Sequence, residues 1–204
     1  MYFHKTFAAA IISGSALFAE NTLHIGAGFP ISILSVDIDG SAEDFNQNAY
    51  DFTIDYTHVF EKGFTLKGGI DVGYVTTSDV KSAVKGDDLG GLDFAVNLGF
   101  GGSPLHNEKM TLSILGTLGL RVQNFSAMED NGVEDISTEL NTVLFYIGPE
   151  VNYTFRFNKH IGMFADFGLF YNMGKSEYSV EDNSDDYDTS GPTFLPKIGV
   201  SVTF

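Results

Sequence analysis

Residues 50–74 read YDFTIDYTHVFEKGFTLKGGIDVGY, and two runs in this stretch carry an apolar side chain at nearly every second position. In residues 50–60, and again in residues 64–74, these apolar side chains alternate with Asp, Thr, Lys or Gly. Because neighbouring side chains of a strand point to opposite faces, each run predicts a strand with one apolar face. The intervening Glu61-Lys62-Gly63 contains a glycine and predicts the turn of a hairpin.

The same alternation recurs along the chain in eight segments, which begin near residues 23, 50, 64, 92, 110, 143, 161 and 194. Short turns are expected near residues 62, 104 and 159. They alternate with long polar segments, expected as loops, at about residues 34–47, 76–90, 124–139 and 174–191. An even number of strands joined in this way predicts an all-β, antiparallel, up-and-down arrangement with every long loop at one end.

Composition excludes nucleic acid as a partner and excludes every site that depends on cysteine. The chain has 204 residues, with 27 Asp and Glu against 11 Lys and Arg and a formal net charge of −16. Such a chain lacks the basic face that nucleic acid requires. No cysteine is present, which excludes disulfides, thiol catalysis and thiolate metal sites. The four long segments hold 18 of the 27 acids, so one end of the molecule is expected to be strongly anionic. We expect no cofactor.

The first nineteen residues form a separate unit. Lys5 is their only charge, and residues 7–18 are apolar or small, as in the n-region and h-region of a secretory signal. We therefore predict a cleaved signal peptide of residues 1–19, cut after Ala19, with a cut after Ala16 as the alternative. The apolar run is too short to span a bilayer as a helix. A buried N-terminal helix is less favoured, because the alternating period starts directly after Glu20.

The polar face of the strands is predicted to line the inside of a closed barrel. It carries many glycines, among them Gly69, Gly73 and Gly99, and a narrow eight-stranded lumen has to combine small side chains with a few large ones. The apolar face then meets lipid, and the segments supply the roughly 9 to 11 residues that a tilted strand needs to cross the hydrocarbon. Closure is required, because an open sheet edge in lipid would leave backbone groups unpaired. Ten ionisable residues fall on the inward face: Asp51, Asp55, Lys67, Asp71, Asp93, Arg121, Glu150, Arg156, Asp166 and Lys197.

Three prolines fit this scheme poorly. Pro30, Pro149 and Pro196 each remove a ladder donor from a sheet that should have no edge, so bulges or strand ends are expected at these positions.

The chain ends on Ile198, Val200, Val202 and Phe204, alternating residues that close with a C-terminal Phe. This pattern resembles the terminal strand of bacterial outer-membrane barrels, and the strand count is similar to the small barrels related to outer-membrane proteins A and X. The resemblance covers about residues 20–204 and implies an eight-stranded transmembrane β-barrel in the outer membrane of a diderm bacterium, with its long loops outside the cell. It also implies outer-membrane lipid, periplasmic chaperones and the barrel-assembly machinery as partners, with the terminal strand as the assembly signal.

Members of such families serve as anchors, adhesins, small pores and occasionally enzymes. The enzymes among barrels of this kind depend on a histidine, as the resemblance implies. The histidines of the mature chain all fall toward the short-turn end: His24, His58, His106 and His160. We therefore expect that the protein is not an enzyme. A loop calcium site is a weak candidate at Asp182, Asp185, Asp186 and Asp188, because the EF-hand spacing is missing.

For the ten lumen charges, a buried, paired network is favoured over a narrow cation-preferring, porin-like path, because eight strands leave an interior that side chains fill. The predicted role is that of a surface protein, in adhesion or envelope integrity, whose acidic loops meet cationic ligands or divalent cations. The alternative is a small-solute channel.

Overall fold

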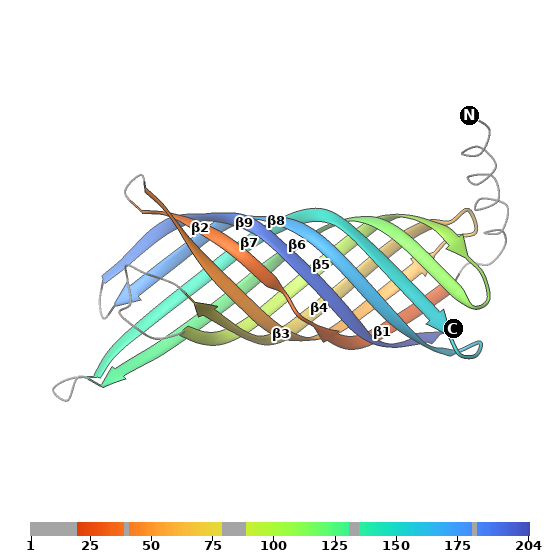
Figure 1. Cartoon of the computed structure of the whole chain (residues 1–204), viewed down its shortest axis with the longest axis horizontal. Helices are drawn as coiled ribbons and strands as arrows, with labels where there is room; N and C mark the ends of the chain where they lie inside the picture. Colours follow the sequence, from red (N-terminus) through yellow and green to blue (C-terminus); the bar gives the residue numbers. More distant parts are fainter. Residues whose placement is uncertain (1–19, 39–40, 79–88, 131–134, 181–182) are drawn as a thin grey trace.

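The computed structural model describes residues 20–38, 41–78, 89–130, 135–180 and 183–204, and the predicted signal peptide lies outside these residues. Strands make up nearly all of the described chain, and they wrap into an elongated barrel (Figure 1). In chain order they are β1 (Glu20–Gly28), β2 (Ile31–Ile38), β3 (Ser41–Val59), β4 (Phe64–Ser78), β5 (Leu89–His106), β6 (Met110–Asp130), β7 (Asp135–Arg156), β8 (Ile161–Val180) and β9 (Asn183–Thr203). Within the described residues no helix is long and apolar enough to span a bilayer.

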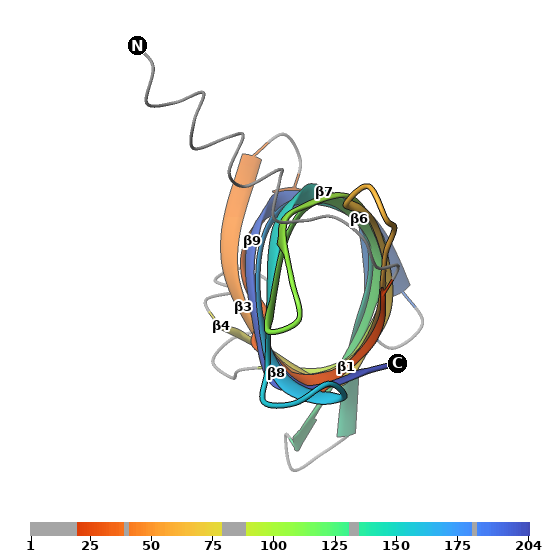
Figure 2. The ribbon, with the colours of Figure 1, turned by 90° about the vertical axis from the view of Figure 1, so that its right-hand side faces the viewer.

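Every pairing in the sheet is antiparallel, and the sheet closes on itself where β9 pairs with β1 and β2. β1 and β2 both pair with β3 on one side and β9 on the other, so they are two halves of one barrel strand. The nine labelled strands therefore form an eight-stranded, up-and-down barrel, which confirms the predicted fold. Figure 2 shows the closed ring from the end that carries the short turns.

Two of the three prolines share one seam of the barrel. Pro30 lies in the break between β1 and β2. Pro196 faces the same break, because its carbonyl accepts a hydrogen bond from the Phe29 amide at 2.9 Å, and the N and O of one strand residue point to the same neighbour. Pro149 lies within β7, where pairing with β8 stops at Ile147 and resumes at Glu150 without a change of register. The predicted strand end is thus found at Pro30, while the other two prolines interrupt pairing on one side only.

The structure corrects the predicted long loops. Most described residues of segments 34–47, 124–139 and 174–191 belong to paired strands that extend the barrel beyond the short span predicted for it. The reason is a reversal of polarity in these extensions. Apolar side chains such as Leu34, Phe45 and Phe125 point inward there, while polar side chains such as Asn48 and Asn124 point outward. Their inner and outer faces therefore resemble those of a soluble barrel.

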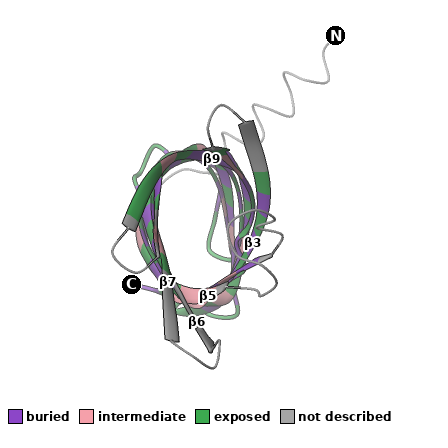
Figure 3. Cartoon of the chain, turned by 90° about the vertical axis from the view of Figure 1, so that its left-hand side faces the viewer, coloured by how far each residue is buried: buried purple, intermediate pink, exposed green. Residues whose placement is uncertain are grey.

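Closer to the short turns, the outer face of the barrel is apolar and the inner face is polar. Large apolar side chains cover the outer surface, for example Leu92 at 70 % exposure, Leu98 at 62 % and Leu169 at 60 %. Figure 3 shows buried, intermediate and exposed residues distributed around the ring of strands, seen from the end of the long hairpins. Exposed aromatic residues flank this apolar belt on both sides: Phe60, Phe100, Phe157 and Phe204 toward the short turns, and Tyr50, Tyr74, Tyr171 and Phe194 toward the long hairpins. An apolar belt on a closed barrel is the surface that a bilayer requires.

Candidate functional site

The lumen holds all ten ionisable side chains that the alternation had placed on the inward face. Each of them is at most 4 % exposed. Buried charges are costly unless they are paired, so their partners decide what the lumen can do. The ten separate into three groups along the barrel.

The central network consists of Lys67, Lys197 and the carboxylates of Asp55, Asp71, Glu150 and Asp166. Lys67 Nζ lies 3.1 Å from Asp55 Oδ2 and 2.8 Å from Asp166 Oδ2, and it also contacts Glu150. Lys197 Nζ lies 2.7 Å from Asp71 Oδ1 and 3.3 Å from Asp55 Oδ2. Asp55 thus connects the two ammonium groups, and one network spans the lumen.

The Arg121 cluster lies next to this network, toward the long hairpins. Arg121 Nη2 is 3.2 Å from Asp51 Oδ2, and Arg121 Nε is 3.3 Å from Asp93 Oδ2. Together the central network and the Arg121 cluster hold six carboxylates against three bases. Alternation already placed six acids and four bases on this face, but it could not show that Arg156 lies apart from the other nine.

Arg156 does not join the other nine. It pairs with Glu20, which the alternation did not single out, and its Nη1 donates to the Asn107 carbonyl at 2.7 Å while Nη2 donates to Thr111 Oγ1 at 2.7 Å. These contacts tie β7 to the first strand and to the β5–β6 turn. They fill the lumen at its short-turn end.

Apolar side chains occupy the lumen toward the long hairpins. One cluster contains Ala49, Val75 and Phe125, with Leu140 packed against it. Two further clusters are Leu34, Phe45 and Leu144 with Val36, and Ala95, Tyr146, Phe170 and Leu195. The described lumen is therefore filled with ion pairs in the centre, with one apolar cluster beside them, and with apolar and hydrogen-bonded polar side chains toward the long hairpins. This arrangement agrees with a plug better than with a water-filled path.

The histidines occupy different environments. His24 is 1 % exposed, stacks on Phe164 with ring centroids 4.6 Å apart, and has Nε2 3.1 Å from Thr154 Oγ1. It lies inside the lumen beside the central network. His58, by contrast, lies on the outer wall with Nδ1 2.7 Å from Asn21 Oδ1. Neither one faces the long-hairpin end.

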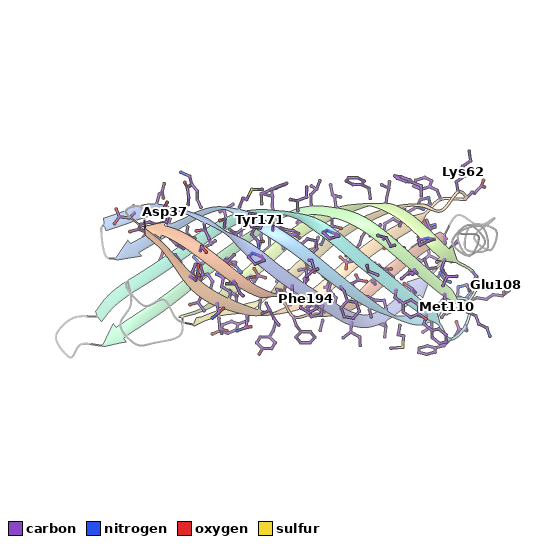
Figure 4. All side chains as sticks on the ribbon, turned by 45° about the horizontal axis from the view of Figure 1, so that its top comes forward. Asp37, Lys62, Glu108, Met110, Tyr171 and Phe194 are labelled. Carbon is purple, nitrogen blue, oxygen red and sulfur yellow. The ribbon has the colours of Figure 1, made fainter. Side chains whose placement is uncertain are left out.

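The outer surface of the extensions carries an acidic face. Its side chains are exposed, and Glu177 lies directly opposite Asp186 in the β8–β9 register, while Lys175 lies opposite Asp188. A cavity of about 470 Å³ opens there, lined by residues of β2, β8 and β9 that include Asp37 and Asp188. Figure 4 shows Asp37 at this end and Lys62 and Glu108 at the opposite one. The acidic face comprises Asp37, Asp44, Glu177, Asp186 and Asp188.

The structure gives little support to the candidate calcium site. Asp182 lies outside the described residues, and Asp185, Asp186 and Asp188 are exposed. No group of three or more His, Cys, Asp or Glu side chains in the described part of the chain is arranged to hold a metal ion.

Comparison with known proteins identifies the fold. No protein-family model and no curated protein sequence matches the chain. Among solved structures, the outer membrane protein OprG from Pseudomonas aeruginosa superposes with a TM-score of 0.51 at 11% identity, over 93% of this chain and 98% of that one. The outer membrane protease OmpT from Escherichia coli superposes with a TM-score of 0.50 at 9% identity, over 91% and 97%.

The fold is that of the bacterial outer-membrane barrels. With its apolar belt, the chain is a transmembrane barrel of the outer membrane.

One sequence-based prediction is wrong. We expected no enzyme from the placement of the histidines, yet OmpT, which shares this fold, is a protease. The architecture is thus compatible with catalysis, and an identity of 9% transfers the fold but no activity to this chain.

Proposed function

We propose that this barrel is a surface interaction protein, which presents the acidic face to cationic surfaces or to divalent cations that bridge it to other anions. The observation that supports this proposal is the concentration of exposed carboxylates on the outer walls of β2, β3, β8 and β9 above the apolar belt. A surface of one sign attracts partners of the other sign and raises their rate of association.

The form of the extensions supports the same role. They are paired strands with apolar side chains inside, so the carboxylates are carried on ordered backbone instead of on long loops. Like charges opposite one another destabilise a strand pair, as Glu177 and Asp186 do here. A cationic partner that relieves this repulsion gains binding free energy from it.

The filled lumen argues against the alternative, a small-solute channel. Ion pairs with side chains at most 5 % exposed span the centre, and three apolar clusters lie beside and above them. Planar-bilayer recording of the refolded protein is expected to show no discrete conductance. Reproducible single-channel steps would favour the channel.

The binding test uses refolded protein in lipid nanodiscs and a fluorescent oligolysine peptide. The variant Asp37→Asn/Glu177→Gln/Asp186→Asn/Asp188→Asn is expected to bind the peptide about tenfold or more weakly, and wild-type binding should disappear near 1 M salt, where the screening length falls to about 3 Å. The matched control is Glu61→Gln/Glu108→Gln, which removes exposed acids from the short turns at the opposite end of the barrel. Equal losses in both variants would refute a role for the acidic face.

A further inference from the structure

Three buried oxygens without partners lie together beside the Arg121 cluster. The register aligns Asp51, Gly73, Asp93 and Gln123 as direct neighbours across β3, β4, β5 and β6, and the side chains of Asp51, Asp93 and Gln123 all point inward. Gly73, between the two aspartates, has no side chain. A Cβ placed there would lie 2.3 Å from Asp51 Oδ1, so that oxygen extends over the glycine toward Asp93.

In this row, one oxygen of each of Asp51, Asp93 and Gln123 lacks a hydrogen-bond donor. Asp51 and Asp93 each direct Oδ2 at the single guanidinium of Arg121. Asp51 Oδ1, Asp93 Oδ1 and Gln123 Oε1 are buried without a hydrogen-bond partner, and Asp93 Oδ2 and Arg121 Nε make no hydrogen bond beyond their ion pair. Asp51, Asp93 and Gln123 are 3 %, 1 % and 1 % exposed. All three oxygens are acceptors, so ionised carboxylates and an amide carbonyl cannot satisfy one another.

The surroundings make the three unpaired oxygens energetically costly if nothing binds them. The next inward row toward the long hairpins contains Ala49, Val75 and Phe125, an apolar cluster that packs above the site. On the other side lies the central network, which already has more carboxylates than ammonium groups. Unpaired buried acceptors in such surroundings lose their hydration without compensation.

We propose that Asp51 Oδ1, Asp93 Oδ1 and Gln123 Oε1 form a lumenal site for a hard cation of the Ca²⁺ or Na⁺ class. Hard cations prefer carboxylate and amide oxygens, and water completes the coordination sphere. The cation offsets the negative charge that Arg121 alone leaves on its two aspartates, and Gln123 supplies a neutral third ligand. The site lies in the lumen and is independent of the acidic face and of the function proposed for it.

Equilibrium dialysis with elemental analysis tests the site directly. The refolded full-length mature chain in detergent is treated with a chelator, moved into choline chloride at fixed ionic strength, and dialysed against CaCl₂ or NaCl. Wild type is expected to retain one equivalent of cation, and Asp93→Asn and Gln123→Met are expected to weaken retention about tenfold or more. Gln123→Met leaves both aspartates and Arg121 in place, so it keeps the test valid if Asp93→Asn fails to fold. The control Asp188→Asn, on the acidic face, should retain the ion as wild type does.

Thermal unfolding in the same buffers gives a second readout. A cation that binds only the folded chain should raise the midpoint for wild type and for Asp188→Asn, with a smaller rise for Gln123→Met. Absence of retained cation in wild type would overturn the proposal. So would retention that is lost in Asp188→Asn and kept in Gln123→Met, which would assign the ion to the acidic face. A midpoint that rises on mild acidification and ignores Ca²⁺ and Na⁺ would assign the site to a proton shared by the two aspartates, which would also overturn it.

Discussion

Replacing Lys67 with Met is expected to destabilise the barrel more than any other change of a single charge. Lys67 Nζ is the contact shared by three carboxylates, with Asp55 at 3.1 Å and Asp166 at 2.8 Å. At an effective dielectric constant of about 20, each such contact is worth roughly 5 kcal/mol before desolvation. Desolvation of the ions offsets most of this, and removing one partner of a buried pair costs about 3–5 kcal/mol. We expect Lys67→Met to fall in that range, because Lys197 still compensates Asp55, at 3.3 Å, but not Glu150 or Asp166.

The assay is equilibrium unfolding in urea of protein refolded into lipid vesicles, with the extrapolated free energy of unfolding as the readout. Lys175→Met, which removes an exposed lysine, is the control and should change this free energy by about 0.5 kcal/mol or less. Adding Glu150→Gln to Lys67→Met should recover part of the loss, because it removes a charge that has lost its partner. Equal effects of Lys67→Met and Lys175→Met, or a further loss on adding Glu150→Gln, would refute the reasoning.

Three further predictions concern the wall, the packing and assembly. Leu120 is 50 % exposed in the middle of the belt, and Leu120→Arg should lower the free energy of unfolding by about 2–4 kcal/mol in the same urea titration. Asn48→Arg, above the belt, should lower it by only about 0–1 kcal/mol. Equal losses for the two variants would contradict contact between the belt and lipid. Phe164→Ala should cost about 3–5 kcal/mol, because the ring is 1 % exposed and stacks on His24, and a loss under about 1 kcal/mol would show that the ring is not packed. Phe204→Ala, at a position 67 % exposed, should lower the amount of folded barrel in outer-membrane fractions of cells while leaving refolding in detergent unchanged; an unchanged cellular level would contradict an assembly signal.

The membrane-embedded half of the fold follows from sequence because its two faces differ so strongly in polarity. Alternation in residues 50–74 predicted the β3–β4 hairpin, and the structure pairs Tyr50 with Tyr74 and Val59 with Thr65 across it. The half of the barrel beyond the belt, toward the long hairpins, did not follow from sequence. In this half, few apolar side chains point inward, and many outward positions are acidic. The sequences of strands such as β2 and the start of β9 therefore resemble polar loops, and loops were predicted there.

The candidate site was predictable only in part. Period-two alternation places Lys67, Asp71 and Asp93 on one face, which is a property of local sequence. Which charges meet depends on the register of strands far apart in the chain, so the pairing of Arg156 with Glu20 carried no local signal. The orphaned oxygens of Asp51, Asp93 and Gln123 were equally hidden, because a single glutamine between Val122 and Asn124 forms no motif that indicates an ion site.

The central claim is that lipid hydrocarbon surrounds the outer wall while the lumen is closed to it. The chain has no Trp, so a single Trp can report on each side of the wall. Leu98→Trp places the probe on the belt, at a position 62 % exposed, and Phe164→Trp places it in the lumen, at one 1 % exposed. In vesicles of brominated phospholipid, fluorescence of the Leu98→Trp protein should be strongly quenched and that of the Phe164→Trp protein should be almost unchanged. Equal quenching of the two, or quenching of the lumenal probe alone, would contradict the account.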